Sequence, residues 1–350
     1  MKFDFAIGNP PYQEEQKSED IKDSLKNFAP PVYHHFIDAA NSVASKVELI
    51  HPARFLFNAG STPKYWNEKM LNDEHFTVLD YEKDSSKVFS NTDIKGGIAI
   101  TYHDNDKNFG CIRTFTAYPE VNSILRKVTS NPSYESIDPI VFSRTSYRLT
   151  EKLHVDFPDA KKYLSEGHLY DVSSNIFQRL PFVFYEKKPT GKQEVFIKII
   201  GRDGNKRVIK YINDKYINEG KNLDNYKVYI PQASGSGQFG EALGLTIVAE
   251  PGIAATETFL SIGKFETKIE AENTERYIKT KFFRCLLSVM KVTQIANKPA
   301  YKYVPLQDFT TSSDIDWSVS IPNIDKQLYK KYNLSQEEIN FIETNVKEME

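Results

Sequence analysis

Phe3-Asp-Phe-Ala-Ile-Gly8, followed directly by Asn9-Pro10-Pro11-Tyr12, is the stretch of sequence that decides the fold. The mostly apolar run predicts a buried strand, and the two prolines predict a rigid turn at its end. Each proline holds its φ at about −65°, lacks a backbone donor, and disfavours helical backbone in the residue before it. The turn therefore places the Asn9 carboxamide and the Tyr12 ring at the carboxyl end of a strand, where open α/β sheets bind ligands.

These two side chains suit the handling of an amino group on a planar ring. The Asn9 side-chain oxygen and the Pro10 backbone carbonyl can each accept a hydrogen bond from an NH₂ group. That arrangement leaves the nitrogen lone pair available for attack on an electrophilic methyl group, while Tyr12 stacks on the ring. Enzymes that act on a base in DNA take it out of the duplex and bind it by stacking and hydrogen bonds. The alternative is a purely structural turn with a packed tyrosine.

The Asn-Pro-Pro-Tyr sequence resembles the catalytic motif of the amino-methyltransferases that use S-adenosylmethionine. Among them, the chain is most similar to the adenine-specific (N6) DNA methyltransferases of restriction–modification systems, of the type IIG-like kind. The resemblance implies S-adenosylmethionine as cofactor, double-stranded DNA as partner, and catalytic roles for Asn9, Pro10, Pro11 and Tyr12. It also implies an apolar residue against the target base, a role that we assign to Phe89, for which core packing is an equally good interpretation.

The composition limits the class of protein. The chain has 350 residues, 40% of them hydrophobic and 26% charged, which favours two domains with buried cores. Its net charge of −2 means that any basic surface for nucleic acid is local. The two cysteines are too few for a disulfide framework or a cysteine-rich zinc site, and we expect no metal. We find no leader sequence and no apolar run long enough for a membrane, so we expect a soluble, cytoplasmic protein.

Strand-like and helix-like segments alternate through the first 115 residues. Strands are expected at residues 46–52, 76–81 and 96–102, and helices at 32–45 and 62–73. This alternation predicts a largely parallel sheet with helical crossovers. Together with the resemblance, it predicts that residues 1–115 form the C-terminal half of a Rossmann-like methyltransferase sheet, in the α/β class. The polar residues 13–29 predict a loop that either closes over a flipped base or is solvated surface.

From residue 116 the pattern changes to short β-like runs separated by glycine turns. A long helix is predicted from Glu270 to Lys291, and Ser335 with Glu338 predicts a capping box at the start of a last helix. The target-recognition domain of the same methyltransferases is resembled by the segments 226–237, 256–258, 270–273, 277–284 and 303–309. We therefore expect residues 116–350 to form an α+β DNA target-recognition domain with C-terminal helices.

Basic and aromatic residues are interleaved in this second part of the chain. Lysine and arginine side chains neutralise phosphates, and loops between strands reach base edges. The best candidate for such a contact loop is Gly201-Arg-Asp-Gly-Asn-Lys-Arg207. We predict DNA contacts from Arg202, Lys206, Arg207 and Lys210. On composition alone, a solvated hairpin is the alternative.

The cofactor-binding half of the family pattern is not found. The resemblance places a Gly-rich turn and an acidic residue before Asn-Pro-Pro-Tyr, or after the recognition domain in permuted families, and here eight residues precede Asn9. The nearest match to such a turn is Gly235-Ser-Gly-Gln-Phe-Gly240, and no convincing helix opens after it. We therefore expect the S-adenosylmethionine site to lie mostly outside this chain, on a second polypeptide or a missing N-terminal part. The strand at residues 3–8 then has an open apolar edge.

Three functions remain open. The first is transfer of a methyl group from S-adenosylmethionine to the N6 amino group of adenine in a specific DNA sequence, within a restriction–modification system. The second is a non-catalytic DNA-recognition or specificity subunit of such a system, in which the Asn-Pro-Pro-Tyr turn is a remnant. The third is methylation of a glutamine side chain in a protein, by enzymes that share the motif but normally lack a long C-terminal reader.

Overall fold

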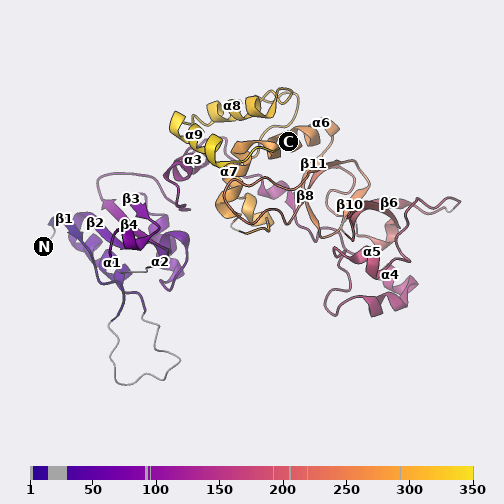
Figure 1. Ribbon diagram of the computed structural model, residues 1–350, viewed down its shortest axis with the longest axis horizontal. Helices are drawn as coiled ribbons and strands as arrows, with labels where there is room; N and C mark the ends of the chain where they lie inside the picture. Colours follow the sequence, from indigo (N-terminus) through magenta and orange to yellow (C-terminus); the bar gives the residue numbers. More distant parts are fainter. Residues whose placement is uncertain are drawn as a thin grey trace, which may run out of the picture. The chain divides into compact units, whose positions relative to one another are not determined.

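The computed structural model describes residues 3–14, 30–90, 94, 96–191, 193–204, 206–218, 220–291 and 293–349. The chain divides into two compact units, which we call unit 1 (Met1–Asn122) and unit 2 (Ser123–Glu350). The division falls within helix α3 (Pro119–Thr129), whereas the sequence placed a boundary at residues 115/116 (Figure 1). The described residues form a mixed α/β structure with three separate sheets. Most of the loop predicted at residues 13–29 lies outside them.

Unit 1 is built on a four-stranded sheet with the order β1-β2-β4-β3. Strand β1 (Phe3–Gly8) pairs in parallel with β2 (Ala44–Pro52). Strand β4 (Ile98–Asp104) pairs antiparallel with both β2 and β3 (Phe76–Glu82). It follows that β1, β2 and β3 run in one direction and that their carboxyl ends meet at one edge of the sheet.

The prediction of a largely parallel sheet is wrong for β4. Parallel neighbours are joined by a crossover of about a dozen residues or more, usually a helix that packs on the sheet. The connection from β3 to β4, residues 83–97, contains only the short 3-10 turn η2 (Ser85–Lys87) in its described part. The chain therefore returns antiparallel beside β3, and β4 lies between β3 and β2.

Helices α1 (Tyr33–Val43) and α2 (Lys64–Leu71) bury their apolar side chains in one core with the sheet. Ile37 on α1 and Trp66 and Met70 on α2 are at most 2% exposed. The Trp66 indole N–H donates a hydrogen bond of 3.0 Å to the Asp38 carboxylate, which ties α2 to α1. A 3-10 helix, η1 (Arg54–Phe57), follows β2. This packing fixes the strands whose ends carry the predicted site.

Strand β1 is not the buried strand that its sequence predicts. Phe3, Phe5 and Ile7 alternate along it and are 54%, 64% and 78% exposed. Among the described strands β1 pairs only with β2, so its other edge has no strand partner there. The Lys46 ammonium group of β2 lies over the Phe5 ring, 5.6 Å from its centroid, but all three apolar side chains remain more than half exposed. An open apolar edge is what the sequence led us to expect for this strand.

Unit 2 contains two small sheets, with the orders β10-β6-β7 and β5-β11-β8-β9. Their strands are β5 (Val141–Phe142), β6 (Phe196–Asp203), β7 (Lys206–Asn213), β8 (Tyr226–Pro231), β9 (Ile247–Ala249), β10 (Ile253–Ala255) and β11 (Phe259–Phe265). One core joins both sheets. It includes Ile199 on β6, Ile212 on β7, Tyr229 on β8 and Phe177 on helix α5 (Ile176–Arg179).

The remaining helices of unit 2 are α4 (Glu151–Asp156), α6 (Lys268–Lys279), α7 (Lys281–Met290), α8 (Ile321–Lys331) and α9 (Gln336–Asn345), with short 3-10 helices at Asp138–Ile140, Pro158–Tyr163, Asp214–Tyr216 and Lys298–Tyr301. Helix α6 packs on β8, β9 and β11. Helix α9 begins with the capping box of Ser335 and Glu338 that the sequence predicts. None of the described helices is both long enough and apolar enough to cross a membrane.

The single helix predicted for residues 270–291 is two helices, α6 and α7, which meet at Thr280. Thr280 has extended backbone (ψ 148°), and its hydroxyl accepts a hydrogen bond of 3.1 Å from the Phe283 N–H. The Asp325 carboxylate of α8 accepts two more, at 3.0 and 2.9 Å, from the first two N–H groups of α7. These acceptors come partly from a distant helix, so the break is fixed by tertiary contacts that local periodicity does not reveal.

Candidate functional site

The Asn9–Tyr12 turn follows β1 at the edge of the unit 1 sheet where three parallel strands end. The last paired residue of β1, Gly8, lies opposite Leu49, close to the end of β2. The Val32 N–H donates a hydrogen bond of 3.1 Å to the Tyr12 carbonyl, which fixes the end of the turn against the entry to α1. Asn9 is exposed, so its carboxamide can reach a ligand at this edge.

Phe89 lies beside Tyr12. The two rings meet edge to face, with centroids 6.5 Å apart and planes inclined by 64°. Phe89 follows β3, and Tyr12 follows β1, so the common direction of these strands brings together two residues that are far apart in the sequence. Both side chains are partly exposed. Together they form an aromatic surface next to Asn9.

The Tyr12 hydroxyl is enclosed and has no hydrogen-bond partner among the described residues. Burial raises the pKa of the Tyr12 phenol, and the nearby Asn9 carboxamide offsets part of that rise. The phenol is therefore neutral at physiological pH. It offers a ring for stacking and a neutral hydrogen-bonding group, and it does not act as a base.

The connection that carries Phe89 returns to the sheet at Gly97. This residue has a φ of 80°, which favours glycine, and a Cβ there would lie 2.5 Å from the Glu82 carbonyl oxygen at the end of β3. Its own carbonyl accepts a hydrogen bond of 3.0 Å from the Ala53 N–H, just after β2. The glycine thus holds the Phe89 connection against the carboxyl ends of β2 and β3.

His51, near the end of β2, is a titratable group that sequence analysis did not consider for the site. Its ring is fully buried, stacks on Tyr33 with centroids 5.7 Å apart, and places Nε2 2.7 Å from the Thr101 hydroxyl. Burial lowers the pKa of His51 to about 4. The imidazole is thus neutral and held by packing, and it supports the edge of the sheet without taking part in proton transfer.

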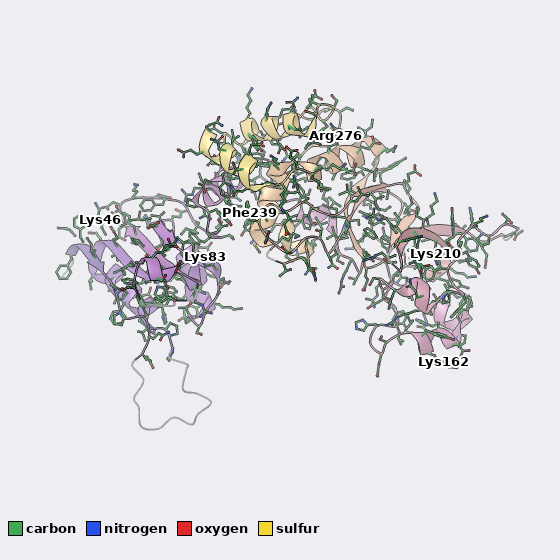
Figure 2. All side chains as sticks on the ribbon, viewed as in Figure 1. Lys46, Lys83, Lys162, Lys210, Phe239 and Arg276 are labelled. Carbon is green, nitrogen blue, oxygen red and sulfur yellow. The ribbon has the colours of Figure 1, made fainter. Side chains whose placement is uncertain are left out.

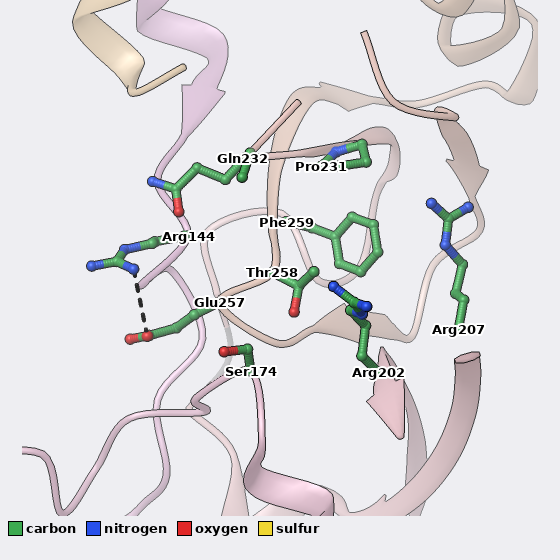
Figure 3. A pocket seen from close by; sticks show the side chains of 10 residues that line it. Arg144, Ser174, Arg202, Arg207, Pro231, Gln232, Glu257, Thr258 and Phe259 are labelled. Atoms are coloured by element: carbon green, nitrogen blue, oxygen red, sulfur yellow. Dashed lines mark ion pairs between the residues drawn. The ribbon is translucent and has the colours of Figure 1, made fainter. Parts of the chain in front are cut away.

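In unit 2, Arg202 and Arg207 lie directly opposite each other on β6 and β7. Both line a cavity of about 450 Å³ between elements of the two sheets (Figure 3). Its wall also includes Arg144, Glu257 and Gln232, which sequence analysis missed because they come from segments far from the hairpin. Only the fold places these polar side chains around the predicted arginines.

The two predicted lysines differ from each other. Lys206 is exposed at the start of β7. Lys210, labelled in Figure 2, is 7% exposed, and its Nζ lies 2.8 Å from the Asp203 carboxylate and 2.9 Å from the Glu186 carboxylate. Two ion pairs within unit 2 therefore neutralise the Lys210 charge, which makes Lys210 a poorer candidate than Lys206 for neutralising a phosphate.

The comparison with protein families identifies the part of the chain that holds the turn. Residues 1–89 match the Eco57I restriction-modification methylase family. The matched segment runs from β1 through the Asn9–Tyr12 turn to Phe89. It confirms the predicted resemblance to restriction–modification methyltransferases over this part of the chain. The comparison with curated proteins found no match.

Solved structures similar to this chain include the type IIG restriction endonuclease BpuSI, with 11% identity and a TM-score of 0.33. Another is the type IIL restriction-modification enzyme MmeI in complex with DNA, with 10% identity and a TM-score of 0.34. The two alignments cover 97% and 98% of this chain, but 52% of BpuSI and 56% of MmeI. This chain therefore spans about half the length of either protein.

S-Adenosylmethionine is the cofactor that a methylase implies, and we assign none of the described residues to a site for it. In the Gly235–Gly240 loop, the nearest sequence match to a cofactor loop, the Ser236 and Gly237 N–H groups already donate to the Glu241 carboxylate at 2.9 Å. Hydrogen bonds from Ser236, its hydroxyl first, lower the pKa of Glu241 to about 2. The loop is a structural turn. Within the described residues, no group of three or more His, Cys, Asp or Glu is placed to hold a metal ion.

Proposed function

We propose that this chain carries the catalytic turn and the DNA-recognition part of a methyltransferase that modifies the N6 amino group of adenine, in a specific duplex sequence, within a restriction–modification system. The observation that carries the proposal is the exposed Asn9 carboxamide beside the Tyr12–Phe89 ring pair, in a segment that matches a methylase family. A flipped base requires both stacking surfaces and hydrogen-bond acceptors at its amino group.

In this proposal, each residue of the turn has a separate task. The Asn9 side-chain oxygen and the Pro10 carbonyl accept the two protons of the amino group, so that its lone pair remains free. Tyr12 stacks on the adenine ring, and Phe89 closes one side of the base. S-Adenosylmethionine, when bound, supplies the electrophilic methyl group. The rate gain from the turn comes from orientation and from hydrogen bonds placed in advance.

Unit 2 is assigned the task of binding duplex DNA. The support is local positive charge on a protein whose net charge is −2: Arg202 and Arg207 face each other on the β6–β7 hairpin, and Lys206 is exposed at its turn. Loop and hairpin cations of this kind neutralise phosphates and reach base edges.

We further propose that a second polypeptide, with the cofactor-binding part of the methyltransferase, completes the unit 1 sheet at β1. The support is the edge of β1 that has no strand partner among the described residues, together with the exposed Phe3, Phe5 and Ile7. An unpaired apolar strand edge readily accepts another strand.

A non-catalytic recognition subunit is the second candidate. The observation that favours it is the local positive charge of Arg202, Arg207 and Lys206 on the β6–β7 hairpin, which supports DNA binding without requiring methyl transfer. In that case the Asn9–Tyr12 turn is a remnant, and the chain binds DNA without transferring a methyl group.

The test is methyl transfer from labelled S-adenosylmethionine to duplex DNA by the full chain together with the product of the adjacent upstream reading frame. We expect N6-methyladenine. Asn9→Ala should lower the rate by about 100-fold or more, the cost of removing one placed hydrogen-bonding group, and should leave DNA binding intact.

The matched control is Asn105→Ala. Asn105 is an exposed asparagine of unit 1 that follows β4, and because β4 runs antiparallel it lies at the opposite edge of the sheet. Loss of the Asn105 side chain should leave the rate of methyl transfer unchanged. DNA binding without any methyl transfer would favour the recognition subunit, and methylation of cytosine or of protein would contradict the proposed substrate.

A further inference from the structure

The cavity that Arg202 and Arg207 line has an unusual charge arrangement. These two arginines are directly opposed on antiparallel strands, a placement in which like charges destabilise the pair. A third arginine, Arg144, lines the same cavity, and the acidic side chain of its lining is Glu257. The lining therefore carries more positive than negative charge and favours a ligand rich in hydrogen-bond acceptors.

Glu257 provides an acceptor on the other side of the cavity. Its side chain is 14% exposed, and its carboxylate pairs with Arg144 at 3.9 Å, longer than a hydrogen bond (Figure 3). Burial, with a smaller contribution from Asp171, raises the pKa of this carboxyl. The carboxylate is thus poorly solvated and has room for a hydrogen-bond donor from a ligand.

The opposite wall is fixed in place. The Arg207 guanidinium donates a hydrogen bond of 3.1 Å to the Leu245 carbonyl and lies over the Phe259 ring, 5.2 Å from its centroid. Figure 3 shows Phe259 and Arg202 between Arg207 and the Arg144–Glu257 pair. The cavity therefore presents the Arg207 guanidinium, which is held in place, on one side and the Glu257 carboxylate on the other.

We infer that this cavity reads one G·C base pair of the DNA target through its major-groove edge. Guanine presents two acceptors there, O6 and N7, which match the Arg202 and Arg207 donors, and cytosine presents the N4 amino donor, which matches Glu257. An A·T pair fits poorly, because thymine places the O4 acceptor opposite the carboxylate. This inference rests on the proposed function, since it requires unit 2 to bind duplex DNA.

The test is selection by the full chain from a duplex library with a randomised segment. The wild-type chain should enrich a motif that contains an invariant G·C pair. Glu257→Gln keeps the size of the side chain but removes its charge and adds a donor. It should relax the motif at that one position, reducing discrimination there by about 5- to 140-fold, and leave the other positions unchanged.

Two control variants separate base reading from other roles. Glu250→Gln alters an exposed glutamate of the same unit and should select the wild-type motif. Lys206→Ala should weaken binding to all sequences alike, as loss of a phosphate contact does.

Either of two results with Glu257→Gln would overturn this inference but leave the proposed function standing. One is an unchanged motif, and the other is an equal loss of affinity for every sequence. A wild-type chain that enriches no motif would overturn the proposed recognition function, and this inference with it.

Discussion

The Tyr12–Phe89 pair shows how much the candidate site depends on single side chains. The Tyr12 ring is placed by the proline turn, and Phe89 lies against its edge, with ring centroids 6.5 Å apart. Neither residue alone would form this aromatic surface. The position of Phe89 beside Tyr12 supports its proposed contact with the target base, although the same position also allows simple packing between the two rings.

Substitution of Tyr12 separates these two roles. Tyr12→Ala should weaken binding of the extruded base by about 1–3 kcal/mol through lost stacking, whereas Tyr12→Phe keeps the ring and should stay close to wild type. Binding of the extruded base is measured by the fluorescence of a 2-aminopurine at the target position, together with the KM for duplex DNA. An equal loss in both variants would assign the effect to the hydroxyl, which has no partner among the described residues.

At the scale of the element, the junction of α6 and α7 depends on one buried carboxyl. Asp325 accepts hydrogen bonds from the first two N–H groups of α7. Burial raises the pKa of Asp325 to about 6 even though these hydrogen bonds act in the opposite direction. The junction is therefore held by a group whose charge is costly to bury.

This shift predicts a pH dependence of stability. A carboxyl whose pKa is higher in the folded than in the unfolded chain stabilises fully below its unfolded pKa, and this contribution is lost as the pH rises through the folded value. As the pH rises from about 4 to about 6, ionisation of Asp325 should therefore lower the free energy of unfolding by about 3 kcal/mol. Urea unfolding of the full chain at several pH values measures it. The difference in the free energy of unfolding between wild type and Asp325→Asn should change over this pH range. The control is Asp224→Asn, at an exposed position, for which this difference should stay constant.

At the scale of the whole molecule, the exposed strand β1 is the feature that links the structure to the proposed second polypeptide. A charged side chain at the strand edge is a common means of preventing strand addition. Ile7 is 78% exposed, so a lysine there should not disturb the core of unit 1.

Ile7→Lys should therefore prevent association with the second polypeptide and abolish methyl transfer, while the variant folds normally. The control is Val155→Lys, at a position in unit 2 that is 62% exposed. Co-purification and the methyl-transfer assay measure both variants. Full association and activity with Ile7→Lys would show that the edge of β1 is not the contact surface.

Local rules in the sequence determined much of this protein. Proline chemistry placed the Asn9–Tyr12 turn after a strand, hydrophobic periodicity located most strands and helices of unit 1, and the Ser335–Glu338 spacing gave the start of α9. These features depend on neighbours within a few residues, so the sequence contains the information that they need.

Only the tertiary structure decided the features that depend on distant partners. Four such features depend on segments far apart in the chain. They are the reversed direction of β4, the helix break held by Asp325, the exposure of β1 and the contact of Tyr12 with Phe89. The same is true of the cavity, where Arg144 and Glu257 join a hairpin whose arginines the sequence did predict. Local propensity cannot encode which segment provides a missing acceptor or covers an exposed face, because burial and pairing are decided by the packing of the whole unit.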